Sequence, residues 1–135
     1  MSDIEIVGLR DLLKDFATAP KIVRKYVLTA MGDSVDAVYK RATTYPPRRP
    51  SSRYIRTFRL QSQWDTDIKT GADDITGRVY NSKTPYGKWV MGEATQAQVH
   101  KGRWYTTADI AREQSPKINR FFEAAVDKVI KWLNR

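Results

Sequence analysis

The sequence contains no cysteine and a single histidine, His100. The lack of cysteine excludes disulfides, thiol nucleophiles, cysteine-ligated zinc and iron–sulfur clusters. One histidine cannot build the usual histidine spacings of a metal site, which would then need carboxylate partners. We therefore expect no metal and no cofactor, and we interpret His100 as a surface or hydrogen-bonding residue in preference to a catalytic base.

Long hydrophobic runs are also missing. The apolar runs are a few residues long, as at Tyr26-Val27-Leu28, whereas a membrane span needs about 20 such residues. The chain begins Met-Ser-Asp-Ile-Glu, which is acidic where a secretion signal is basic and then apolar. The sequence predicts a protein that is made in the cytoplasm and does not associate with membranes.

The motifs of common enzyme classes are absent as well. None of the seven glycines stands in the GxGxxG or GxxxxGK spacing of phosphate-binding loops, and no serine stands in GxSxG. The carboxylate pairs Asp65/Asp67 and Asp73/Asp74 are interpreted as solvated residues of a strand and of a turn. The sequence predicts no enzyme, and a nuclease that uses scattered carboxylates is the weakest of the alternatives.

What the sequence does contain is positive charge. It has 24 basic against 15 acidic residues, a net charge of +9, and 41% hydrophobic residues in a length of 135. This length and composition predict one domain, 1–135, with a single core. The charge favours an anionic partner, either nucleic acid or an acidic protein surface, although a solvated basic face would look the same.

The hydrophobic pattern of the first third predicts a strand followed by helices. Ile4 and Ile6 alternate with a glutamate, which predicts a short strand over 3–8. Apolar residues at spacings of three and four then predict a short helix around 9–16 and a long amphipathic helix over about 20–44. The long helix should end before Pro46, because the residue before a proline disfavours the α conformation.

The remaining pattern predicts a β-hairpin and a C-terminal helix, and hence an α+β fold. Alternation predicts strands over 58–68 and 75–81. The stretch 86–90 fits either a short helix or an irregular strand. Thr106 and Asp109 have the spacing of a capping box, and Ser115-Pro116 indicates that the final helix either bends or restarts there.

An exposed segment rich in proline and arginine, 46–53, separates the long helix from the hairpin. Five arginines lie within twelve residues in and just after this segment: Arg48, Arg49, Arg53, Arg56 and Arg59. A guanidinium group binds carboxylate or phosphate through a planar fork of donors. We interpret the five as candidate docking or phosphate contacts; a loop kept charged for solubility is the alternative.

Aromatic residues gather in the last third, at Tyr86, Trp89, Trp104 and Tyr105. Such residues could form a platform on which nucleic-acid bases stack. They could equally pack the ends of the helices against the hairpin, and we favour this second interpretation.

The order of the motifs resembles a known family. The stretch Arg56-Thr57-Phe58-Arg59-Leu60-Gln61-Ser62-Gln63-Trp64 is followed by Gly77-Arg78-Val79-Tyr80-Asn81, a Pro-Tyr-Gly-x-Trp-Val element over 85–90, and Gln-Ala-x-x-His-x-x-Arg-Trp over 96–104. This order resembles the small tail-completion and head–tail joining (neck) proteins of long-tailed bacteriophages. The family's Thr-Gly pair at the start of the first strand is Thr57-Phe58 in this chain.

The resemblance implies an α+β virion protein of a phage or prophage, located in the neck or tail, without catalytic residues. It implies a ring-shaped homo-oligomer that contacts connector, neck or tail-tube proteins. In such a ring the arginine-rich segment would dock on an acidic neighbour, or would line a channel and touch DNA without reading its sequence. The alternative function is a nucleic-acid-binding protein that uses the basic loop without sequence specificity.

Overall fold

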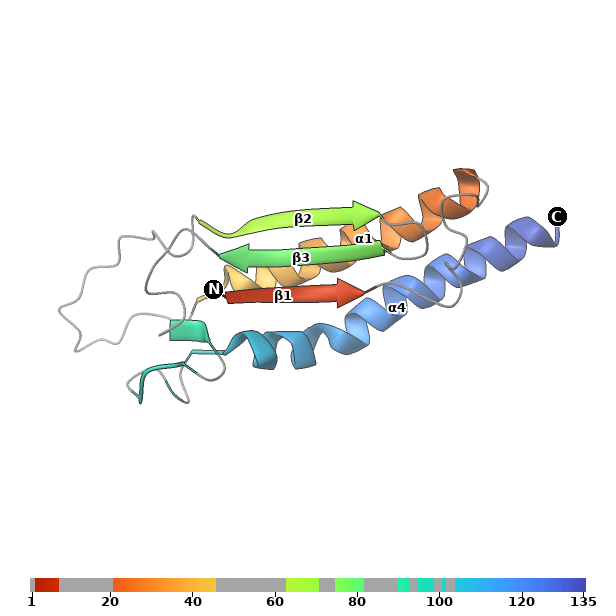
Figure 1. Cartoon of the computed structure of the whole chain (residues 1–135). Coiled ribbons are helices and arrows are strands. Elements are labelled where there is room, and N and C mark those ends of the chain that lie inside the picture. Colours follow the sequence, from red (N-terminus) through yellow and green to blue (C-terminus); the bar gives the residue numbers. More distant parts are fainter. Residues whose placement is uncertain are drawn as a thin grey trace.

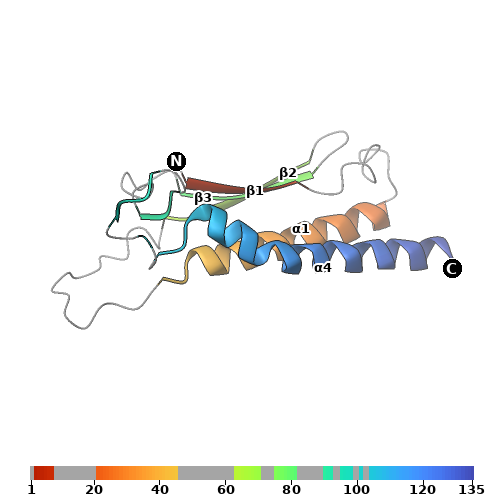
Figure 2. The same ribbon diagram turned by 90° about the horizontal axis from the view of Figure 1, so that it is seen from below.

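The computed structural model shows a three-stranded antiparallel sheet with two long helices on one of its faces (Figures 1 and 2). This arrangement confirms the α+β class. The elements are β1 (Ser2–Val7), α1 (Lys21–Ala42), β2 (Asp65–Thr70), β3 (Ile75–Asn81) and α4 (Thr107–Leu133). The structure describes residues 2–7, 21–45, 63–70, 75–81, 90–92, 95–98, 101 and 104–135.

Strand β3 lies at the centre of the sheet, in the order β1-β3-β2. Ile4 of β1 pairs with Val79 of β3, which pairs on its other side with Thr66 of β2. Because side chains alternate along a strand, these three residues face the helices, and their sequence neighbours face away from them. The predicted alternation of β1 is confirmed, since Ile4 and Ile6 are buried.

Helix α1 lies within the range for which the sequence predicts a helix. One of its faces is buried, and it packs against α4 and over β3. This buried face consists of Val27, Ala30, Met31, Ser34, Val35, Ala37, Val38 and Ala42. The hydroxyl of Ser34 donates a hydrogen bond of 2.7 Å to the carbonyl of Ala30, so this buried polar group is satisfied within its own helix.

Helix α4 begins with the predicted capping box. The Oγ1 of Thr106 accepts a hydrogen bond from the backbone N–H of Asp109, and the carboxylate of Asp109 accepts one from the backbone N–H of Thr106. The helix continues through Pro116 to Leu133, so of the two alternatives predicted at Ser115-Pro116, a bend or a restart, the restart is excluded. Its axis changes direction along its first half, as the predicted bend requires (Figures 1 and 2).

The first hairpin strand is shorter than its pattern predicts. Gln63 and Trp64 precede β2 instead of belonging to it, and residues 58–62 lie outside the described part of the chain. Ile68 faces the helices but is 39% exposed, because β2 is an edge strand that the described helices cover only in part. The pattern therefore predicted the correct face for Ile68 but not its exposure.

Other predictions fall on residues that the structure does not describe. These are the short helix around 9–16, the segment 46–53, the pair Asp73/Asp74, most of the stretch 86–90, and His100. Val90 and Met91 are helical. Among the described helices, none is both long and apolar enough to cross a membrane.

Candidate docking site

A hydrogen bond joins two described residues on either side of residues 46–62, which we call the arginine-rich region. Tyr45 follows the end of α1 and Trp64 precedes β2. The indole Nε1–H of Trp64 donates to the hydroxyl of Tyr45 over 2.9 Å, and Trp64 is buried. Two residues that lie 19 positions apart, on either side of the chain over 46–62, are therefore held next to each other.

All five predicted site residues lie in that region, outside the described part of the chain: Arg48, Arg49, Arg53, Arg56 and Arg59. The structure thus locates where the arginine-rich region is attached, and the prediction of its contacts remains a prediction. The structure adds a cluster of aromatic residues beside this region, which the sequence analysis did not single out as a group.

Trp104 belongs to the same cluster as Tyr45 and Trp64. Its ring packs on the ring of Tyr45 with centroids 4.8 Å apart and planes inclined at 57°. The side-chain amide of Gln96 donates to the carbonyls of Val90 and Trp104 over 2.8 and 2.9 Å, which holds the backbone before α4 in place. The ring of Trp104 thus ties the end of α1 to the start of α4, whereas the interpretation from the sequence had the aromatic residues packing the helix ends against the hairpin. We call Tyr45, Trp64 and Trp104 the aromatic base.

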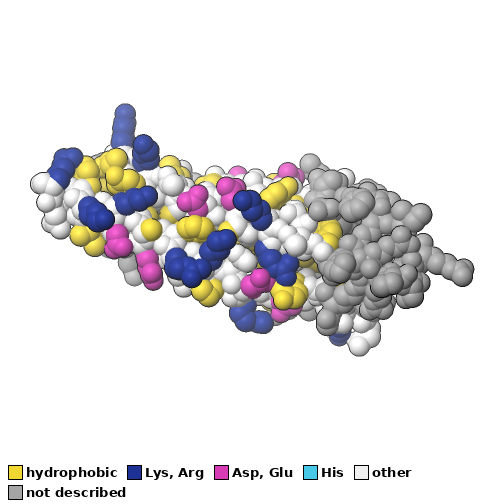
Figure 3. All heavy atoms as spheres, turned by 180° about the vertical axis from the view of Figure 1, so that it is seen from behind, with side chains coloured by type: hydrophobic (Ala, Val, Ile, Leu, Met, Phe, Trp, Pro, Cys, Tyr) yellow, Lys and Arg dark blue, Asp and Glu magenta, His cyan; other side chains and the backbone are white. Residues whose placement is uncertain are grey.

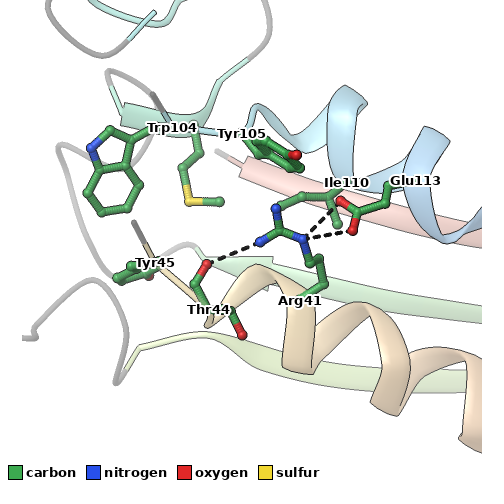
Figure 4. Close-up of a pocket in the computed structure, with 8 residues that line it drawn as sticks. Arg41, Thr44, Tyr45, Trp104, Tyr105, Ile110 and Glu113 are labelled. Atoms are coloured by element: carbon green, nitrogen blue, oxygen red, sulfur yellow. Dashed lines mark hydrogen bonds and ion pairs between the residues drawn. The ribbon is translucent and has the colours of Figure 1, made fainter. Parts of the chain in front are cut away.

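An ion pair beside the aromatic base links the two helices (Figure 4). The Nε of Arg41 lies 2.9 and 3.1 Å from the two carboxylate oxygens of Glu113. An Nη1–H of Arg41 donates to the carbonyl of Thr44, and the guanidinium lies 4.1 Å from the ring centroid of Tyr105. Since the Arg41 side chain is only 23% exposed, this pair is less screened than a pair at the open surface.

A pocket of about 440 Å³ opens between the end of α1 and the start of α4. Its lining consists of Arg41, Thr44, Tyr45, Met91, Trp104, Tyr105, Ile110 and Glu113. The two charged residues of this lining are already paired with each other, and most of the other walls are aromatic or apolar (Figure 4). The described lining is suited to packing or binding, because its two charges neutralise each other and its remaining walls are mostly aromatic or apolar.

A hydrogen bond and an ion pair of Asp109 stabilise the first turn of α4, beside this pocket. The backbone N–H of Thr106, 3.0 Å from Oδ2 of Asp109, lowers the pKa of that carboxyl below its ordinary value of 3.8. Arg112, whose Nη1 lies 3.4 Å from Oδ1 of Asp109, lowers this pKa further. A carboxylate in the first turn also complements the helix dipole.

The predicted carboxylate pair Asp65/Asp67 lies on the sheet face turned away from the helices. Asp67 is within 4.0 Å of the ammonium group of Lys69. Across the sheet, Asp3 of β1 forms an ion pair of 3.1 Å with Arg78 of β3. No group of three or more histidine and carboxylate side chains among the described residues could hold a metal ion.

Two features of the site were not predicted from the sequence. Arg41 and Glu113 lie 72 positions apart, and only the packing of α1 on α4 brings them together. The sequence analysis expected Trp104 to pack at the helix ends but did not single out Tyr45, whose position directly before Pro46 at a helix end was an available signal. No protein-family model, curated protein or solved structure matches the chain.

Proposed function

We propose that the chain is a structural virion protein of a tailed phage or prophage, which completes the tail or joins head to tail as part of a ring. The observation that carries this proposal is the hydrogen bond between Tyr45 and Trp64, which holds together the chain on either side of the arginine-rich region. A basic segment attached at one point can reach a neighbouring subunit while the rest of the fold stays unchanged.

The fixed attachment favours docking for an energetic reason. Ordering a segment on a partner costs conformational entropy, and part of that cost is already met when its two ends are held together. The arginines then supply paired N–H donors that match carboxylates on an acidic neighbour. The long amphipathic helix α1 adds a rigid element with an exposed outer face, and β1 and β2 each leave one edge unpaired among the described strands.

The proposal is tested by docking of the purified chain to connector, neck or tail-tube proteins. A variant with glutamine at the five arginines named above keeps the length and polarity of the region but removes its charge. We expect size-exclusion chromatography with light scattering to show a complex for the wild type and none for this variant. The control is Lys117→Gln/Arg120→Gln, which removes exposed charge from α4 far along the chain from the region.

A wild-type chain that stays monomeric and engages none of these proteins would count against the proposal. The second candidate is a nucleic-acid-binding protein, favoured by the net charge of +9 and the same five arginines. Such a protein binds duplex DNA at low salt and loses affinity steeply as salt rises. The absence of DNA binding at low salt would remove this candidate.

A further inference from the structure

A basic groove lies at the end of the molecule opposite the aromatic base. It has a volume of about 540 Å³, and its lining consists of Lys21, Arg24, Lys25, Leu28, Thr29 and Thr70. The groove therefore runs between the first half of α1 and the end of β2. Its described lining residues include three cations and no carboxylate, and Leu28 is 39% exposed within it. Figure 3 shows lysine and arginine side chains around hydrophobic ones at this end of the molecule.

A surface of opposite charge lies on the outer face of the sheet, which the described helices leave uncovered (Figure 2). The strand register places Glu5 and Asp67 on either side of Arg78. It likewise places Asp3 and Asp65 on either side of Tyr80. Counting Lys69, the described strand residues of this face are four carboxylates and two cations among their charges, so these residues are net negative although the whole chain is strongly basic. We call this surface the acidic sheet face.

We infer that the acidic sheet face of one copy docks on the basic groove of the next. The inference rests on the proposed ring and names the surfaces that would build it. Because the two surfaces are different parts of one molecule, the contact is heterologous, and repeating it generates a ring when the rotation from copy to copy closes. The groove disfavours an uncharged or basic occupant, since its three cations would then lose solvent without gaining a counter-charge.

The simplest competing contact is continuation of the sheet from copy to copy. It would pair the free edge of β1 with the free edge of β2 of a neighbour. The outward-facing Asp3 and Glu5 would then come beside Asp65 and Asp67 of that neighbour on the same face. Like charges on adjacent strands are destabilising, so repulsion between these carboxylates disfavours pairing of the two strand edges. The face-to-groove contact avoids the repulsion and uses the same carboxylates.

The test is a charge exchange. The groove variant is Arg24→Glu/Lys25→Glu, and the face variant is Glu5→Lys/Asp67→Lys. We expect sedimentation velocity at low salt to show wild-type self-association that is weakened at least about tenfold in either variant. An equimolar mixture of the two variants should associate again, because every face-to-groove contact between unlike copies is then complementary. Lys117→Glu/Arg120→Glu is the control and should behave as the wild type.

Several outcomes would overturn the inference. Association that is unchanged in both variants, or a mixture that fails to associate, shows that the copies meet elsewhere; the proposed function then still stands if the chain docks to neck or tail proteins. A wild-type chain that stays monomeric at its highest soluble concentration also rejects the contact. If the groove variant instead loses binding to labelled duplex DNA while self-association persists, the groove binds nucleic acid.

Discussion

Gly77 sets the distance between the sheet and α1. A Cβ at this position would lie 2.5 Å from Cγ2 of Val35 and 2.7 Å from Sδ of Met31, both in the buried face of the helix. The Val35 methyl group cannot move aside without shifting its helix, because a branched side chain there has one strongly preferred rotamer. We expect Gly77→Ala to lower the free energy of unfolding by about 1–3 kcal/mol, measured by urea denaturation.

Gly32 provides the matched control for this substitution. It lies in the interior of α1, and a Cβ added there would meet no atom within 4 Å. Alanine is the better helix former, so Gly32→Ala should raise the free energy of unfolding by about 0.5–1 kcal/mol. Two substitutions of the same kind should thus have opposite signs, and a loss of equal size in both would contradict the close approach at Gly77.

At the scale of elements, the capping box of α4 makes stability depend on pH. The folded state lowers the pKa of Asp109 through the N–H of Thr106 and through Arg112. The resulting stabilisation is complete above the ordinary value of 3.8 and is lost as the pH falls through the lower folded pKa. We expect Asp109→Asn to cost about 0.5–1 kcal/mol at neutral pH, a modest effect because the carboxyl is largely solvated.

Thermal unfolding between about pH 7 and about pH 2 checks this expectation. The difference between the wild type and Asp109→Asn should shrink toward the acidic end, where the wild-type carboxyl is protonated as well. Asp36→Asn, at an exposed position in the interior of α1, is the control and should not show this convergence. A difference that stays constant over the whole range would rule out the capping carboxylate as its source.

The elements that the sequence predicted well are those with local causes. The capping box needs only Thr106 and Asp109, and the alternation of β3 lies within one strand, so both could be located from the sequence. The edge position of β2 depends on which strand lies beside it, and for this reason the exposure of Ile68 was missed. The pairing of Arg41 with Glu113 depends on how two distant helices pack, which no local pattern contains.

At the scale of the whole molecule, the net charge of +9 indicated an anionic partner but not where it would bind. Folding separates the charge, since the strand register gathers four carboxylates on one sheet face and α1 places three cations along a groove. Neither surface is contiguous in the sequence. The arginine-rich region, by contrast, is contiguous and could be recognised directly, although its attachment to the aromatic base could not.

That attachment yields a prediction for a chain from which residues 47–53 are removed. The hydrogen bond between Tyr45 and Trp64 holds the ends of the region together, and the described core is built from residues outside it. Shortening a closed loop changes its closure entropy only slightly, by about 0.6 kcal/mol for each halving. We therefore expect the deletion to alter the free energy of unfolding by less than about 1 kcal/mol, measured by urea denaturation, while docking to neck or tail proteins is lost. A loss of stability well above that value would show that the region belongs to the fold, and retained docking would show that another surface makes the contact.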